Sequence, residues 1–410
     1  MLLPLLLACL LLGGCGGQHV EEQTPAATAT QITPTPVSVP VAFQPLYGEL
    51  QSLLETAQAE FASQDKQGQP PSLVVELLTA NGNRGEDLLQ PANLDSTRRF
   101  LDRFKELGAW GVSVQIVYPL LDPNFPRHDE YLAFYRTVAA DVRQRDLKLI
   151  IETGAPFIGT EFSPLHIDYT GKTSQSYLQE RLAQATTIAH ELRPDYLCLA
   201  EEQMTERMLT GLNITTDDYM SFLSSARATI EPPSGVKLGA GSGSWEKPDL
   251  IQRVTQETSL DFVDIHIYPL SNGITDYLQV TADWASAARV AGKEAVIGEA
   301  WLYKVSVKEL QAGAGFQELF GRDVYSFWQP LDVLFMQTVV DMGRSTGIRY
   351  ISFFWSRYLF GYVNYDSLPP GTTGAALQQT ANMAEVIAFA HGELSAMGEA
   401  FQRLAAQSAN

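Results

Sequence analysis

The sequence predicts a (β/α)₈ TIM barrel of the α/β class, on three observations. Eight apolar runs of strand length recur along the chain, amphipathic segments of helical period separate them, and two of the runs end in glutamate. Strand–helix alternation calls for right-handed parallel crossovers, and eight repeats close a barrel that has no exposed edge. The alternative is a doubly wound open sheet. It would show a Gly-rich phosphate turn after its first strand, where this chain has the polar ELLTANGNRGED.

The eight runs are short and nearly continuous in apolar residues, as buried parallel strands are. They are LVVELL at 73–78, VSVQIVY at 112–118, LKLIIE at 147–152, DYLCLA at 195–200, VKLGAG at 236–241, FVDIHIY at 262–268, EAVIGE at 294–299 and YISFFW at 350–355. The GAGSG run at 239–243 is expected to be a loop after its strand, where glycine makes a tight turn.

Helices are predicted where apolar residues recur at spacings of three and four, as at 96–111, 130–146 and 176–192. Ser96, Thr173 and Thr216 precede helical stretches and are the predicted N-caps. The longest connection, 302–349, is expected to hold an extended loop that overhangs the mouth of the barrel, where substrate clefts form.

The N-terminal segment predicts export. Residues 1–14 are interpreted as a signal peptide, because MLLPLLLACLLL is apolar but too short to span a bilayer as a mature helix. LGGC resembles a bacterial lipobox, which implies cleavage before Cys15 and lipidation of its thiol. Residues 15–42 then form a Thr/Pro-rich linker and residues 43–410 the catalytic barrel. The alternative is an uncleaved anchor. Either way the body is expected outside the cytoplasm, at the bacterial cell surface or in the periplasm.

Composition excludes several classes of function. The chain has 410 residues, with 47 acidic against 28 basic side chains and a net charge of −19, which would repel nucleic acid and anionic lipid. Contact with the membrane is therefore expected through the lipid anchor only. No GKS, GKT, GxGxxG, CxxC or HExxH motif is present, so no cofactor and no metal is expected. Only Cys198 remains after processing, which excludes a disulfide within the mature chain.

Two carboxylates at strand ends carry the chemistry. Glu299 follows AVIG, and the pair Glu201–Glu202 follows LCLA. Glycoside hydrolysis needs one carboxyl group to protonate the leaving oxygen and another to attack the anomeric carbon or activate water. Rigid strand ends hold such a pair across a cleft, so the sequence predicts a glycosidase.

These motifs resemble those of clan A glycoside hydrolases over most of residues 70–360, and PDYLCLAEEQ looks closest to endo-β-1,4-galactanases and related endoglycanases. The resemblance implies a retaining barrel with Glu202 as acid/base after the fourth strand and Glu299 as nucleophile after the seventh. Glu201 takes the place of the family's Asn, which donates a hydrogen bond to the sugar 2-hydroxyl. An ionised Glu201 only accepts hydrogen bonds, and which of the two glutamates is the acid/base stays open.

The resemblance also implies carbohydrate-binding roles for residues on the sixth and eighth strands. IHIY supplies His266 at the sugar site and Tyr268 as a hydrogen-bond donor to the nucleophile, and Trp355 in FFWSRY matches a sugar platform. Trp301 and Trp245, just past strand ends, are further candidate stacking platforms. The alternative for each of these side chains is ordinary packing.

The prediction is therefore an exported, lipid-tethered retaining glycosidase that acts on β-linked polysaccharide or oligosaccharide. The first alternative is a glycan-binding lipoprotein with a degenerate barrel, favoured by Glu201 in place of Asn. The second is a solute-binding lipoprotein, which would need two hinged lobes. The sugar, the linkage, endo or exo action and the oligomeric state do not follow from the sequence.

Overall fold

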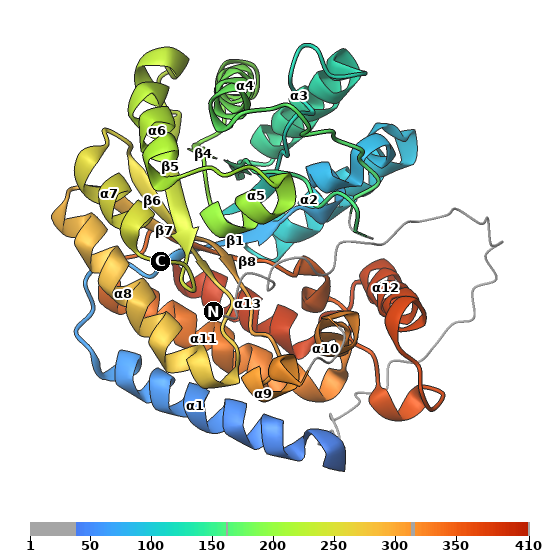
Figure 1. The fold of residues 1–410 in the computed structure, drawn as a ribbon. Coiled ribbons are helices and arrows are strands. Elements are labelled where there is room, and N and C mark those ends of the chain that lie inside the picture. Colours follow the sequence, from blue (N-terminus) through green and yellow to red (C-terminus); the bar gives the residue numbers. More distant parts are fainter. Residues whose placement is uncertain (1–37, 161–162, 313–315, 409–410) are drawn as a thin grey trace.

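The computed structural model describes residues 38–160, 163–312 and 316–408, which contain a closed barrel of eight parallel strands (Figure 1). Each strand pairs with its sequence neighbours, and β1 closes the barrel against β8. The strands are β1 Ser72–Glu76, β2 Gly111–Gln115, β3 Lys148–Glu152, β4 Tyr196–Cys198, β5 Lys237–Gly243, β6 Phe262–Ile267, β7 Glu294–Ala300 and β8 Tyr350–Phe353. All eight overlap the predicted runs, so the (β/α)₈ prediction is confirmed. A doubly wound sheet and a two-lobed body are excluded for this part of the chain.

Helices surround the barrel and connect its strands (Figure 1). They are α1 Gln44–Ser63, α2 Pro91–Glu106, α3 His128–Gln144, α4 Ser174–Thr187, α5 Gln203–Thr210, α6 Thr216–Ile230, α7 Asp249–Glu257, α8 Ile274–Val290, α9 Val307–Gln311, α10 Phe316–Gly321, α11 Gln329–Thr346, α12 Gly374–His391 and α13 Ala396–Ser408. Figure 1 shows α1 along the outside of the barrel next to α8 and α11, and these helices are in contact.

The helix starts agree with the predicted N-caps in one case of three. Thr173 caps α4 in a capping box with Ser176, as predicted. Thr216 is wrong by one residue, since Thr215 caps α6. Ser96 is wrong because α2 already begins at Pro91, whose ring presets the helical φ angle at the first position.

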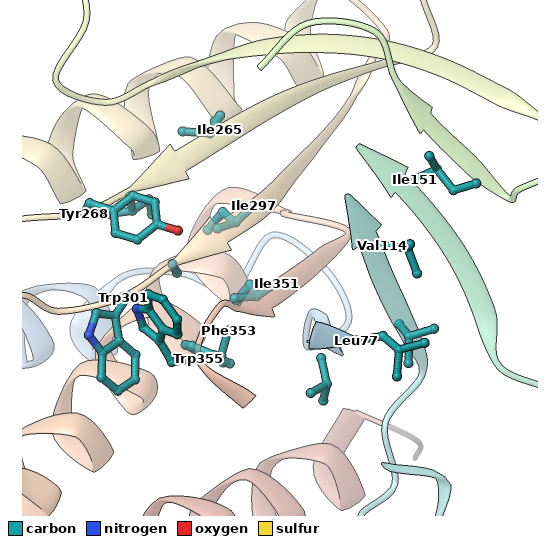
Figure 2. Packing of buried hydrophobic residues seen from close by; sticks show 14 of the residues in the cluster. Leu77, Val114, Ile151, Ile265, Tyr268, Ile297, Trp301, Ile351, Phe353 and Trp355 are labelled. Atoms are coloured by element: carbon teal, nitrogen blue, oxygen red, sulfur yellow. The ribbon is translucent and has the colours of Figure 1, made fainter. Parts of the chain in front are cut away.

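The barrel has two apolar surfaces because successive side chains of a strand point to opposite faces. Outward residues pack against the helices, as Val114, Ile151, Ile265, Ile297 and Ile351 do (Figure 2). A separate cluster fills one layer of the interior and contains Val74, Ile150, Tyr196, Cys198, Phe262, Val296 and Tyr350. Cys198 is a buried free thiol.

The GAGSG run is part of β5, so its expected assignment as a loop is wrong. A Cβ atom at Gly239 would lie 2.3 Å from the ring of Phe262, and one at Gly241 would lie 1.8 Å from the backbone oxygen of Asp264. These glycines therefore serve the close approach of β5 to β6, and no turn requires them.

The connection between β7 and β8 differs from the expected extended loop, because α9, α10 and α11 occupy most of it. A buried ion pair anchors its first part: Lys304 Nζ lies 2.5 Å from Asp332 Oδ1, and both side chains are almost fully buried. Arg322 donates to the backbone oxygen of Lys304 at 2.7 Å. Removal of either partner would leave the other charge buried and uncompensated, so the pair fixes the start of this connection to α11.

The predicted signal peptide, Cys15 and most of the linker lie outside the described residues. A search of the described helices for one of sufficient length and apolarity to cross a bilayer finds no candidate.

Candidate active site

Three predicted site residues meet at the C-terminal end of the barrel. His266 on β6 lies with its Nδ1 2.7 Å from Glu202 Oε1 and 3.4 Å from Glu299 Oε2. The same nitrogen contacts both oxygens, so Glu202 Oε1 and Glu299 Oε2 lie at most about 6 Å apart, which is the sum of the two distances. The carboxyl groups of retaining glycosidases are separated by roughly 5–5.5 Å. All three side chains are buried. The fold therefore brings together two carboxyl groups that are 97 positions apart, at residues 202 and 299.

An irregularity in β7 turns Glu299 toward the interior. Ile265 pairs with Ile297, but His266 pairs with Glu299, so Gly298 is an extra residue in the register. Strict alternation would place Glu299 on the outward face of Ile297. A bulge re-aims the next side chain. A Cβ at Gly298 would lie 2.5 Å from Asp264 Oδ1, so only glycine fits this bulge without displacement of a neighbour.

Tyr268 fixes the orientation of Glu299. Its hydroxyl donates a hydrogen bond to Glu299 Oε2 at 2.5 Å. The Tyr268 ring stacks on Tyr303, with 5.3 Å between centroids, and Trp245 meets it edge-on at 5.8 Å. The structure thus places Tyr268 where the sequence-based resemblance implied, next to the candidate nucleophile.

Burial and neighbouring charges set the protonation of this group. Burial raises the pKa of Glu299 to about 7, His266 opposes the rise, and Glu202 adds to it. Burial alone would lower the pKa of His266, but Glu299 and Glu202 outweigh this and raise the pKa well above its ordinary value. The two carboxyl groups therefore favour the protonated, cationic form of His266.

A second layer of acidic groups, formed by Glu152, Glu201 and Asp264, lies next to Glu202 and Glu299. Burial and repulsion between carboxylates raise the pKa of Glu152, and burial, with repulsion from Glu299, raises that of Glu201 despite the opposing effect of His266. One ligand atom each from Glu152, Glu201, His266 and Glu299 lies within 4.8 Å of the others. Carboxylates and imidazole are metal ligands, so these four residues are close enough together to hold a cation.

Sequence reasoning assigned no role to Glu152 and did not count Asp264 among the site residues. Glu152 ends the apolar run LKLIIE, just as Glu299 ends EAVIGE, so the same signal was present. Asp264 Oδ1 accepts a hydrogen bond from the backbone N–H of Gly298 at 2.8 Å and so supports the bulge.

The three predicted sugar platforms differ in exposure. Trp301 is 1% exposed, stacks on Tyr358 with 4.7 Å between centroids, and donates from Nε1 to Asp323 at 2.8 Å. Trp355 is 2% exposed. Figure 2 shows both rings within the apolar packing. For these two the structure favours packing over sugar stacking, whereas half-buried Trp245 keeps accessible surface next to Tyr268.

Buried polar contacts hold the ends of β3 and β4 ahead of Glu201 and Glu202. Arg181 donates to the backbone oxygens of Thr153 at 2.8 Å and Leu199 at 2.6 Å, and it forms an ion pair with Glu206 of α5. Tyr177 donates to the same carboxylate at 2.6 Å. This network fixes the turn from β4 into α5, on which both glutamates lie.

Comparison with solved structures finds barrels of the same kind. An exo-β-1,4-mannosidase from Opitutaceae bacterium strain TAV5 aligns with a TM-score of 0.54 at 15% identity, over 84% of this chain and 60% of the mannosidase. The GH5_18 protein from Bifidobacterium longum subsp. longum aligns with a TM-score of 0.52 at 14% identity, over 83% of this chain and 79% of that protein. A variant of the latter was solved in complex with Manβ1-4GlcNAc.

The chain has the (β/α)₈ barrel fold. At these identities the likeness extends to the fold alone, and this chain spans less than two thirds of the mannosidase. No family model and no curated protein matches the chain. The assignment of chemistry therefore depends on the site geometry.

Proposed function

We propose that this protein is a retaining glycoside hydrolase that cleaves β-glycosidic bonds in a polysaccharide or oligosaccharide. The observation that carries the proposal is the pair Glu202 and Glu299, joined through His266 at the C-terminal end of the barrel. One oxygen of each lies at most about 6 Å from an oxygen of the other, which agrees with the roughly 5–5.5 Å of retaining enzymes. The mannosidase with the same fold supports a β-glycosidic substrate.

In the proposed first step, Glu299 attacks the anomeric carbon while Glu202 protonates the departing oxygen. In the second step, Glu202 takes a proton from water, which attacks the glycosyl ester and releases the sugar with its original configuration. Tyr268 orients the attacking carboxylate. Positively charged His266 lowers the pKa of Glu299 and so favours its ionised form.

The proposal includes export as a lipoprotein anchored through Cys15, which depends on the lipobox-like LGGC. A galactanase-like specificity also remains a prediction from PDYLCLAEEQ. Mass spectrometry of the N-terminal peptide from a bacterial membrane fraction tests the anchor, and a panel of β-linked glycans tests the specificity.

The configuration of the first-formed product tests the mechanism. The protein is incubated with β-linked gluco-, manno- and galacto-oligosaccharides, and ¹H NMR follows the anomeric signals before mutarotation. We expect the β-anomer to appear first. An initial α-anomer would contradict retention, while the absence of turnover on every glycan would favour the glycan-binding alternative.

Tyr268→Phe should lower kcat/KM by roughly 10- to 150-fold, since one hydrogen bond to a charged group is worth roughly 1.5–3 kcal/mol. The hydroxyl lowers the pKa of Glu299 from what burial alone would impose, so its loss raises that pKa above about 7. Glu299 must be ionised to attack. Because its pKa is higher in the variant, the acidic limb of the kcat/KM profile should move to higher pH. Tyr303→Phe is the control, because it removes a hydroxyl from the ring that stacks on Tyr268 while keeping the ring stack. An unmoved acidic limb in Tyr268→Phe would contradict this role.

A further inference from the structure

The second acidic layer contains buried acceptors that the proposed mechanism does not use. Glu152 Oε1 and Glu201 Oε1 are buried and lack a hydrogen-bond partner within the described part of the chain, and so does His266 Nε2. His266 is 1% exposed, and one of its ring nitrogens belongs to the group of atoms that lie within 4.8 Å of one another. Unpartnered polar atoms at this depth call for a water molecule, an ion or a polar group of a ligand beside them.

Lysine and arginine do not balance this layer. Across residues 38–160, 163–312 and 316–408, neither residue type forms an ion pair with Glu152, Glu201 or Asp264. His266 is the one cationic partner in the group, and its Nδ1 already faces Glu202 and Glu299. A cation that entered this layer would therefore meet buried carboxyl groups that no Lys or Arg already pairs.

We propose that Glu201 and Glu152 bind a protonated amino group of the substrate, so that the enzyme prefers glycans built from β-linked 2-amino-2-deoxy sugars. This inference rests on the proposed glycosidase function. Carbon 2 is the position that we infer for the amino group. Glu299 must reach the anomeric carbon, and atoms of Glu152 and Glu201 lie within 4.8 Å of its ligand atom. The substituent nearest the anomeric carbon on the ring is the one on carbon 2.

An ammonium group fits these acceptors better than a hydroxyl group does. It carries three N–H donors and a full positive charge, whereas a hydroxyl has a single donor and no charge. Burial raises the pKa of both Glu152 and Glu201, so each carboxylate ionises more readily when a cation lies beside it. The net charge of −19 would also concentrate a polycationic glycan at the protein surface and repel uronic acid polymers.

The test compares substrates that differ at carbon 2. The protein is assayed at mildly acidic pH with β-1,4-linked glucosamine oligomers, their N-acetylated forms and cello-oligomers of equal length. We expect kcat/KM to be at least about tenfold higher for the amine than for either neutral series, which corresponds to about 1.4 kcal/mol. Glu201→Gln keeps the size of the side chain but removes its charge, and should reduce this ratio about tenfold. Glu152→Gln should also reduce the ratio of kcat/KM between the amine and the neutral substrates.

Measurements of glycan binding test recognition of the amino group independently of catalysis. In the Glu299→Gln background, calorimetry should show tighter binding of the glucosamine oligomer, with a loss of that preference when Glu201→Gln is added. Glu393→Gln removes a charge from an exposed side chain and should leave the ratio unchanged. Thermal unfolding of each variant checks that it is folded.

Three outcomes decide the matter. Equal or better hydrolysis of neutral glycans, with a ratio unaffected by Glu201→Gln, overturns the amino-sugar proposal while the glycosidase proposal stands. Tighter binding of the amine without hydrolysis of any glycan overturns the glycosidase proposal and leaves amine recognition intact. Stoichiometric Mn²⁺ or Ca²⁺ binding that Glu201→Gln abolishes, with no preference for the amine, makes this layer a metal site and overturns the proposal.

Discussion

Glu299→Ala should lose at least about 10³-fold in kcat, and sodium azide should restore turnover with an α-glycosyl azide as the product. The substitution removes the carboxylate that forms the covalent intermediate and leaves room on the same face of the sugar. Azide can attack the anomeric carbon from that side while Glu202 protonates the leaving group. Only one displacement then occurs, so the β-linked substrate yields the α-azide.

The anomeric configuration of the azide product distinguishes the roles of the two glutamates. In Glu202→Ala the nucleophile is intact, so azide should intercept the glycosyl-enzyme and give the β-azide. Glu299→Gln, which keeps nearly the same volume at this buried position, should be inactive but fold like the parent protein. Wild-type activity in Glu299→Ala, or a β-azide from it, would show that the nucleophile is elsewhere.

Glu202→Gln should lower kcat/KM by roughly 10²–10⁴-fold for substrates with a sugar leaving group, the range expected for loss of a general acid. Aryl glycosides with a weakly basic leaving group need little protonation, so their kcat/KM should stay near that of the parent. kcat/KM reports the first irreversible step and therefore isolates the departure of the leaving group.

Glu201→Gln is the matched control for this experiment. It is the adjacent carboxyl group, buried to a similar degree, and it lacks the short contact with His266 Nδ1 that Glu202 has. Its effect should be the same for sugar and aryl leaving groups. If the loss of kcat/KM depended on the leaving group in Glu201→Gln but not in Glu202→Gln, then Glu201 and not Glu202 would be the acid/base.

Strand positions follow from sequence more readily than helix starts do in this chain. A buried parallel strand is apolar on both faces, so runs such as FVDIHIY stand out against polar connections. The start of α2 was misplaced because its capping position is Gln90, which has no side-chain cap hydrogen bond and gives no signal of its own. The glycines of β5 were misassigned for a related reason, since only contact with β6 shows why they lack side chains.

Some candidate residues follow from the sequence because their signal is local. A carboxylate at the end of an apolar run identifies Glu299 and the pair at 201 and 202, and alternation along IHIY places His266 and Tyr268 on one face. The tryptophans could not be ranked in this way. Exposure of a ring depends on distant partners such as Tyr358, which covers Trp301.

The pattern of apolar runs and amphipathic segments was enough to determine the barrel and the end of it that carries the acidic residues, because both depend on periodicity along the chain. Tertiary structure alone decided that Glu299 faces inward, since this depends on a register shift at Gly298 against β6. It also decided that Glu202 contacts His266 and that, among the described residues, no Lys or Arg forms an ion pair with Glu152 or Glu201. Contacts between side chains from different strands depend on distances through space, which spacing along the chain does not specify.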